Sequence, residues 1–248
     1  MSPFLDPLAP YIPLFGTDHL LALGAVLAAL ALMLVFCRQV RDHASVLRWA
    51  FLMLALAQQV ALYWYQVAVA GWDWGDSTPL HISRVTTLIL MAYLITGRRA
   101  VLEVGFYFGL YAYATFLYPQ RIQPLDHLMG WSFLVSHAVT ILVPVFAGIS
   151  YGWRPTLRGL RRAYGWFVVY FVVVLAVNAM TGGNYFYLKY RPFLRDLPDP
   201  LYWLAACAAT LALMWVGYAV SRRFPVRGDA GYATETAATG SWNLSART

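Results

Sequence analysis

Seven long apolar runs constrain this chain more than any other feature of its sequence. Each is close to the roughly 20 residues that a helix needs to cross the hydrocarbon core of a bilayer. Backbone groups inside lipid must be satisfied within the segment, so runs of this length are expected to be helices. The sequence therefore predicts an all-α fold, a polytopic membrane bundle of seven transmembrane helices. The runs lie at residues 18–37, 49–70, 79–96, 101–118, 129–150, 164–180 and 200–220.

The charge content of the chain agrees with a membrane protein. Only 12% of its residues are charged and 60% are hydrophobic, whereas about 25% of the residues of a soluble domain are charged. The net charge of +7 comes from basic residues at the ends of the apolar runs, not from the continuous basic stripe of a nucleic-acid-binding protein. We therefore expect membrane lipids, and no nucleic acid, as partners.

Basic residues are divided unequally between the two sides of the predicted bundle. Counted as far as residue 227, the segments after the first, third, fifth and seventh runs hold twelve lysines and arginines, and the alternate segments hold four. The positive-inside rule then predicts an N-terminus outside the cell and a C-terminus in the cytoplasm. The resulting division is an extracytoplasmic segment at 1–17, a transmembrane domain at 18–220 and a tail at 221–248. Because the tail is rich in Gly, Ala, Thr and Ser, we expect it to be disordered.

Ionisable and amide side chains concentrate in the predicted outer half of the bundle. Such side chains are costly in a membrane and usually line an interior site. His81 and Arg84 lie three residues apart near the outer start of the third run, so we expect them to share a helix face. The other polar residues of this half or near the midplane are His19, Gln59, Gln66, His137, Asn184 and Tyr185. This distribution predicts one polar pocket in the outer half of the bundle.

Less specific interpretations of the same residues remain open. Arg84 can extend to the outer phosphates as a plain interfacial anchor. A single histidine inside a membrane is often only a hydrogen-bond partner between two helices. The pocket therefore depends on His81 and His137 facing a common space.

Five short motifs carry a resemblance to a known family. The stretches "FGTDHLLAL", "TPLHIS", "SHAVTILVP", "YGWRPTLRGLRR" and "GGNYFYL" occur in this order over about residues 15–220. In this order they resemble the bacterial YwaF-type integral membrane family. That family is similar, more distantly, to the eukaryotic transmembrane protein 164 acyltransferases and to the androgen-induced membrane hydrolases.

The resemblance implies a seven-helix protein of the bacterial cytoplasmic membrane that moves acyl chains between lipids. His19, His81, His137 and Asn184 fall on recurring polar positions of the family. Two departures concern the nucleophile. Leu80 stands where the eukaryotic relatives have a reactive cysteine, and Ser83 stands where bacterial relatives often have one. The mechanism of the eukaryotic relatives therefore does not transfer directly.

An acyltransferase or lipid-ester hydrolase needs a nucleophile or an acceptor hydroxyl within reach of a base. Ser83 is the candidate nucleophile, but it lies about 200° around a helix from His81, so His137 would have to serve it. Alternatively, a histidine activates the acceptor hydroxyl directly, and Arg84 holds a phosphate or stabilises an oxyanion. The candidate catalytic residues are His81, His137, Ser83 and His19, and the candidate substrate-binding residues are Arg84, Asn184, Tyr185, Gln66 and Gln59.

Other functions fit the same pocket. A transporter or a lipid- or anion-binding protein would use Arg84 to select an anion without any chemistry, and a scaffold would need no site. A metal site of His19, His81 and His137 is a further alternative, because three histidines with an open position form a familiar catalytic arrangement. These histidines show no local spacing motif, and Cys37 and Cys207 show no metal-ligand spacing. We therefore expect no metal and no cofactor.

Overall fold

The fold is a bundle of long helices. The structure is a computed structural model, and it describes residues 3–118 and 122–223. The described residues contain no strand. Most of the predicted tail at 221–248, from residue 224 onward, lies outside the described residues. The helices are η1 (Pro3–Leu5), α1 (Thr17–Val35), α2 (Cys37–Asp42), α3 (Ala44–Ala68), α4 (Ile82–Thr96), α5 (Arg99–Leu117), α6 (Leu128–Tyr151), α7 (Leu157–Thr181), η2 (Tyr185–Tyr187) and α8 (Asp199–Ser221).

The predicted all-α membrane bundle is confirmed. Among the described residues, six helices are long and apolar enough to cross a bilayer, namely α1, α3, α5, α6, α7 and α8. The seventh, α4, is also apolar but shorter. The short helix α2 joins α1 to α3 and was not predicted. The direction in which the bundle crosses the membrane stays a prediction.

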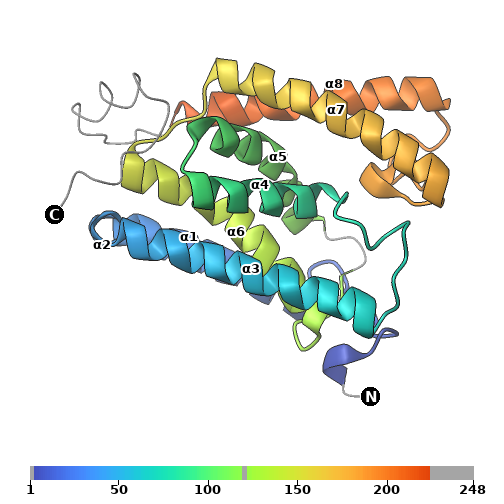
Figure 1. The fold of residues 1–248 in the computed structure, drawn as a ribbon, viewed down its shortest axis with the longest axis horizontal. Helices are drawn as coiled ribbons and strands as arrows, with labels where there is room; N and C mark the ends of the chain where they lie inside the picture. Colours follow the sequence, from blue (N-terminus) through green and yellow to red (C-terminus); the bar gives the residue numbers. More distant parts are fainter. Residues whose placement is uncertain (1–2, 119–121, 224–248) are drawn as a thin grey trace.

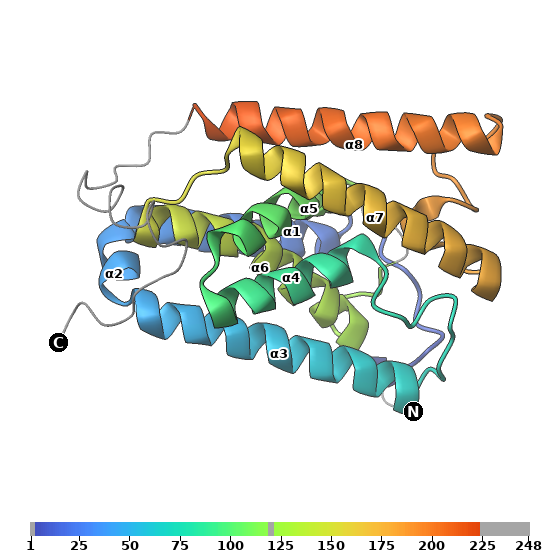
Figure 2. The ribbon, with the colours of Figure 1, turned by 45° about the horizontal axis from the view of Figure 1, so that its top comes forward.

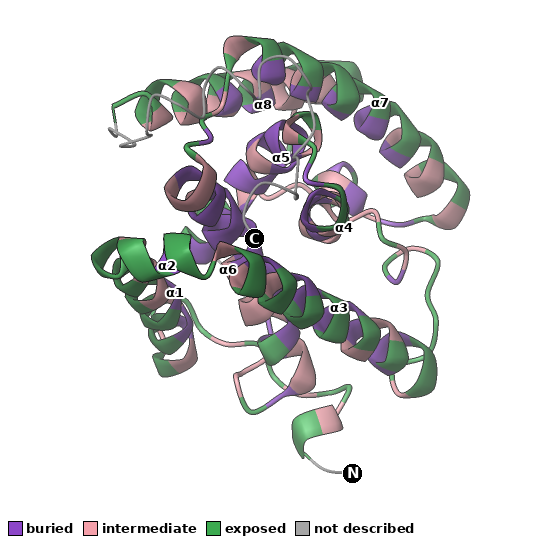
Figure 3. Ribbon diagram, turned by 60° about the vertical axis from the view of Figure 1, so that its left-hand side comes forward, coloured by how far each residue is buried: buried purple, intermediate pink, exposed green. Residues whose placement is uncertain are grey.

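The helices are arranged around α5 and α6 (Figures 1 and 2). Helices α1 and α3 lie on one side of this pair, α4 packs beside α5, and α7 and α8 lie on the other side. Buried residues concentrate on α5 and α6, whereas α1 and α8 are largely exposed along their length (Figure 3). Only 11% of the membrane-length window of α8 is buried, against 61% for α6, so α8 is a peripheral helix that faces lipid along most of its surface.

The seven helices begin one to seven residues from their predicted starts. Helix α7 begins at Leu157 rather than near residue 164, because the Thr156 side chain caps it by accepting a hydrogen bond from the Gly159 N–H. Helix α4 begins at Ile82 rather than near residue 79. His81 is its N-cap residue, with an extended backbone. His81 therefore lies at the helix boundary rather than inside the helix, and its side chain and that of Arg84 both contact Asp76.

Helix α4 falls short of the bilayer thickness at one end. Its 15 residues rise about 22 Å at 1.5 Å per residue, whereas the hydrocarbon core is about 30 Å thick. Its last turn is fixed to the first turns of α3, because the buried Arg48 guanidinium donates to the Leu94 and Ile95 carbonyls at 2.6 and 2.9 Å. The 25 residues of α3 rise about 37 Å, so α4 begins well below the point where α3 ends.

The segment 69–81 fills this difference in height. It leaves the end of α3 and returns into the bundle, where the Ser77 hydroxyl donates to Gln66 Oε1 at 2.9 Å. Ser77 is fully buried. We call the end of the bundle where α3 ends and α4 begins the site end; it lies to the right in Figure 1. The starting residue of α4 is thereby recessed from the site end.

Candidate functional site

A cavity of about 1980 Å³ opens at the site end, between residues of α3 to α8 and the loops that join them. Its volume exceeds the roughly 300–1,000 Å³ of pockets for drug-sized ligands. Each helix contributes lining residues only from its half nearest the site end, as far as the described residues go. A Cβ atom on Gly109 would lie 2.8 Å from the Thr140 methyl group, so α5 and α6 pack closely at the level of these two lining residues. The described lining residues do not continue into the other half of the bundle.

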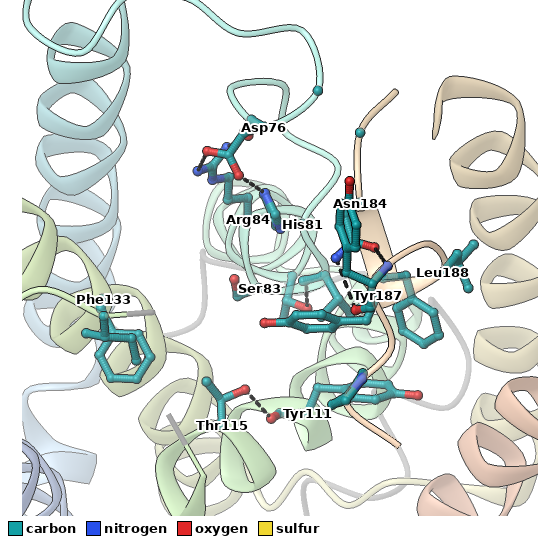
Figure 4. A pocket seen from close by; sticks show the side chains of 18 of the residues that line it. Asp76, His81, Ser83, Arg84, Tyr111, Thr115, Phe133, Asn184, Tyr187 and Leu188 are labelled. Atoms are coloured by element: carbon teal, nitrogen blue, oxygen red, sulfur yellow. Dashed lines mark hydrogen bonds and ion pairs between the residues drawn. The ribbon is translucent and has the colours of Figure 1, made fainter. Parts of the chain in front are cut away.

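His81, Arg84 and Asp76 form a charged cluster on the cavity wall (Figure 4). The Nε2 atom of His81 lies 2.9 Å from Asp76 Oδ1. Arg84 donates from Nη1 to the carbonyls of Asp76 and Thr78 at 2.5 and 3.1 Å, and its Nη2 lies 3.9 Å from Asp76 Oδ2. The contacts with Asp76 and with the two carbonyls therefore fix the positions of the His81 ring and the Arg84 guanidinium relative to each other.

The loop that carries Asp76 is held by its own hydrogen bonds. The Asp73 carboxylate accepts from the Gly75 N–H at 2.8 Å, and the Asp73 N–H donates to the Ser77 hydroxyl oxygen at 3.0 Å. A Cβ atom on Gly75 would lie 3.1 Å from the Gly183 Cα. Glycine at both positions lets the loop before α4 approach the loop after α7. Asp76 is thus placed by a folded turn rather than by a helix.

Tyr185 secures the two loops to each other. Its hydroxyl accepts from the Thr78 N–H and hydroxyl at 3.2 and 2.6 Å and donates to the Trp74 carbonyl at 2.9 Å. Its ring, which is fully buried, packs edge-on against His81 with the centroids 4.9 Å apart. Burial raises the pKa of Tyr185 above its ordinary value, so the hydroxyl stays protonated and can donate. Tyr185 does not line the cavity; it supports the wall.

Asn184 and Gln66 line the cavity, as expected, but part of each amide is already engaged. The Asn184 Oδ1 accepts from the N–H groups of Lys189 and Tyr190, both at 2.9 Å, and thereby shapes the loop after α7. The Gln66 Oε1 accepts from Ser77. These residues therefore position the loops that form the rim of the cavity.

A second polar group lies deeper in the cavity, on α3 and α6. Gln59 donates to Gln58 Oε1 at 2.9 Å, and Gln58 donates to the Ser132 hydroxyl at 2.7 Å. One helical turn further along α6, His137 Nδ1 lies 2.8 Å from the Phe133 carbonyl and donates to it. Its ring also stacks on Phe133, with the centroids 4.1 Å apart. This tautomer leaves Nε2 of His137 as a hydrogen-bond acceptor.

His19 is separated from the other two histidines. It does not line the cavity, and both ring nitrogens are engaged, Nδ1 by the Phe15 N–H at 2.9 Å and Nε2 by the Phe116 carbonyl at 2.6 Å. It joins the start of α1 to the end of α5. Over residues 3–118 and 122–223, no group of three or more His, Cys, Asp or Glu side chains is placed to hold a metal ion.

The sequence profile of the TMEM164 family matches residues 14–219. The chain belongs to the TMEM164 family. The resemblance to the transmembrane protein 164 family noted from the motifs thus extends over nearly the whole bundle. With the apolar helices, it identifies an integral, multi-pass membrane protein.

Two further comparisons do not indicate an activity for this chain. A Treponema pallidum (strain Nichols) protein, described as uncharacterized, is 24% identical to this TMEM164 family member over 210 residues. The match covers 82% of this chain and 87% of the other protein. No solved structure matches this chain.

Ser83, the candidate nucleophile of this TMEM164 family member, lines the cavity. Its hydroxyl makes no hydrogen bond to a histidine within the described parts of the chain, and Figure 4 shows it pointing away from the His81 ring. His81 precedes the helix, so the angle around the helix that was expected to separate the two side chains does not apply.

Sequence reasoning missed Asp76. It contacts both His81 and Arg84, yet it lies outside the apolar run predicted at residues 79–96, where the candidate residues were sought. The available signal was an acidic residue five positions before a histidine in "GDSTPLH".

Proposed function

We propose that this protein is a membrane-embedded enzyme that acts on lipid acyl esters, as an acyltransferase or a lipid-ester hydrolase. The observation that carries the proposal is the 2.9 Å pair of His81 Nε2 and Asp76 Oδ1 on the wall of the cavity. A carboxylate on one ring nitrogen orients the histidine and leaves the other nitrogen as the base, the arrangement that activates hydroxyl groups in acyl transfer.

In the proposed reaction, His81 Nδ1 removes the proton of an acceptor hydroxyl, either a lipid hydroxyl or water. The oxygen attacks the ester carbonyl carbon, a new C–O bond forms, and the old ester C–O bond breaks. The leaving oxygen takes the proton back from His81. The Asp76 carboxylate offsets the positive charge that the ring carries between these two proton transfers.

Direct activation of the acceptor is preferred over a covalent step on Ser83. A nucleophilic serine needs a base within hydrogen-bond reach, and Ser83 makes no such contact among the described residues. Arg84 donates from Nη1 to two carbonyls and keeps its Nε–H for a carbonyl or phosphate oxygen. Deeper in the cavity, His137 Nε2 and the Gln59 amide provide further polar contacts for the glycerol region of a lipid.

The distribution of the lining residues favours this function over transport. A transporter needs polar, water-accessible positions that continue towards the other side of the membrane, whereas the described lining residues lie in the half of the bundle nearest the site end. With the orientation that we propose from the basic residues, the site end faces the extracytoplasmic leaflet.

Lipid profiling of a deletion strain tests the proposal in cells. Loss of the gene is expected to change the acyl-chain distribution of one lipid class. Wild-type protein restores it, and His81→Ala does not, although it is present in the membrane at the wild-type level. An acyl-chain distribution that is the same with and without the gene rejects the enzymatic function.

A further inference from the structure

One side of the cavity is lined mainly by alanine, leucine and aromatic side chains, and we treat it as an arm of the cavity. It runs between α5, α7 and α8, away from the charged cluster, and Figure 4 shows Tyr111 and Thr115 on the side of the cavity opposite Asp76 and Arg84. The helix residues that line this arm are Tyr111, Ala114, Thr115, Leu175, Ala179, Tyr202, Trp203, Ala206 and Ala209. We call these nine residues the α5–α8 arm.

The hydroxyl groups along the α5–α8 arm are satisfied within the protein. Thr115 donates to the Tyr111 carbonyl at 2.9 Å. Thr210, fully buried just beyond Ala209, donates to the Ala206 carbonyl at 2.8 Å. Its oxygen therefore accepts the hydrogen bond from the Tyr111 hydroxyl, with the two oxygens 2.5 Å apart. Tyr202 donates to the Tyr187 carbonyl at 3.2 Å. The hydroxyl hydrogens of the arm are therefore all used within the protein, so an apolar occupant fits it best.

The Tyr111–Thr210 pair closes the arm at its deep end. Beyond this pair, α5 and α8 are in direct contact, since a Cβ atom on Gly217 would lie 2.5 Å from the Leu110 side chain. On the side of the site end, the alanines 206 and 209 leave the space between the two helices open. From Tyr202 to Thr210, α8 rises about 12 Å.

Phe186 bounds the arm on the side of the loops. It has a positive φ of 56°, a conformation that costs a non-glycine residue about 1–3 kcal/mol. In this conformation its ring packs on Tyr111 and Phe167, with centroids 5.4 Å apart in both cases. The loop after α7 thus places an aromatic ring between α5 and α7 at the deep end of the arm, against Tyr111.

We propose that the α5–α8 arm binds one acyl chain of a membrane lipid, and that Tyr111 and Thr210 set the chain length it accepts. The occupant is an acyl chain because α8 faces the hydrocarbon of the bilayer and because the arm joins the cavity that holds His81. This inference rests on the proposed function, since it assigns the acyl part of the lipid on which His81 would act.

Photocrosslinking tests the arm independently of catalysis. The protein is reconstituted in nanodiscs with a phospholipid that carries a diazirine in the distal half of one acyl chain, and labelled peptides are mapped by mass spectrometry. We expect labels near Tyr111 and Ala206. In Ala206→Trp the indole fills the arm and excludes part of the acyl chain from it. Each methylene excluded from the arm weakens binding of the chain about fourfold. Labelling of these peptides should therefore fall at least about tenfold.

The matched control is Leu204→Trp, which adds the same indole on an outward-facing position of α8 that is 68% exposed and should leave the labelling unchanged. In Tyr111→Ala the floor opens, and the labels should move towards Met214. Equal labelling in Ala206→Trp and Leu204→Trp would overturn the proposal that the arm binds an acyl chain. Labels that stay in place in Tyr111→Ala would overturn the proposal that Tyr111 limits the chain length.

His81→Ala separates the two proposals, because it removes the proposed base but should label as the wild type does. If the wild-type arm is labelled but the protein transfers no acyl group, the acyl-chain binding proposal is supported and the enzymatic proposal is rejected. If the protein transfers acyl groups but α5 and α8 carry no labels, the acyl-chain binding proposal is rejected and the enzymatic proposal is retained.

Discussion

Asp76 Oδ1 lies 2.9 Å from His81 Nε2, and neither residue is part of a regular helix. The aspartate is on a turn after α3, and the histidine is the N-cap of α4. The two meet because α4 begins below the end of α3, so the connecting loop must re-enter the bundle. A charged pair is thereby recessed from the site end and opens onto a cavity.

Asp76→Asn should lower acyl transfer or hydrolysis by about 10²- to 10⁴-fold, because the amide cannot offset the charge that His81 gains. The side-chain volume is unchanged, so folding should be retained. Asp73→Asn is the matched control: its carbonyl oxygen can still accept from the Gly75 N–H, and its rate should stay near that of the wild type. Equal rates for both variants would remove Asp76 from the mechanism.

Tyr185→Phe should lower the stability of the folded protein by about 1–3 kcal/mol, because Thr78 and the Trp74 carbonyl lose a buried partner. Tyr190→Phe is the control, since the Tyr190 side chain is 68% exposed. Thermal unfolding in detergent measures both. If the two variants unfold at the same temperature, Tyr185 does not secure the loops.

Gly159→Ala should destabilise the end of the bundle opposite the site. The added Cβ would lie 2.3 Å from the carboxylate carbon of Glu103, whose oxygens accept from Thr156 and Arg162. Overpacking of this kind costs about 1–3 kcal/mol. Gly165→Ala, on the same helix with open space around the Cβ position, should be neutral or slightly stabilising. A loss of stability in both variants alike would show a general effect of alanine in α7.

The orientation predicted from the basic residues is testable with single cysteines. In a variant without Cys37 and Cys207, Trp74→Cys at the site end should react with a membrane-impermeant maleimide on intact spheroplasts. Arg158→Cys, at the start of α7, should react only after the membrane is opened. The reverse pattern would place the site end in the cytoplasm.

The helices could be predicted from the sequence because an apolar run of membrane length leaves the backbone few alternatives. Six of the seven runs match a helix of spanning length to within a few residues, except at the early start of α7. The start of α4 could not be predicted from hydropathy, because the turn that precedes it also contains apolar residues. The position of this start depends on the hydrogen bond between Ser77, in the loop before α4, and Gln66, near the end of α3.

Which of the candidate site residues line a common cavity could not be predicted from the sequence. His81, Arg84 and His137 line one cavity, whereas His19 and Tyr185 lie outside it with their polar atoms engaged in joining segments. Depth along a helix does not tell which way a side chain points. The sequence therefore could not separate a histidine that lines the cavity from one that binds a neighbouring backbone carbonyl.

The most direct test of the central claim is an acyl-transfer assay on the purified protein. Wild-type protein in nanodiscs is supplied with a phospholipid bearing an isotope-labelled acyl chain, together with a lysophospholipid acceptor. We expect the labelled chain to appear on the acceptor, or as free fatty acid, at a rate that falls at least about 10²-fold in His81→Ala. A labelled chain that stays on its original lipid, or a rate that is the same in His81→Ala, would contradict the account.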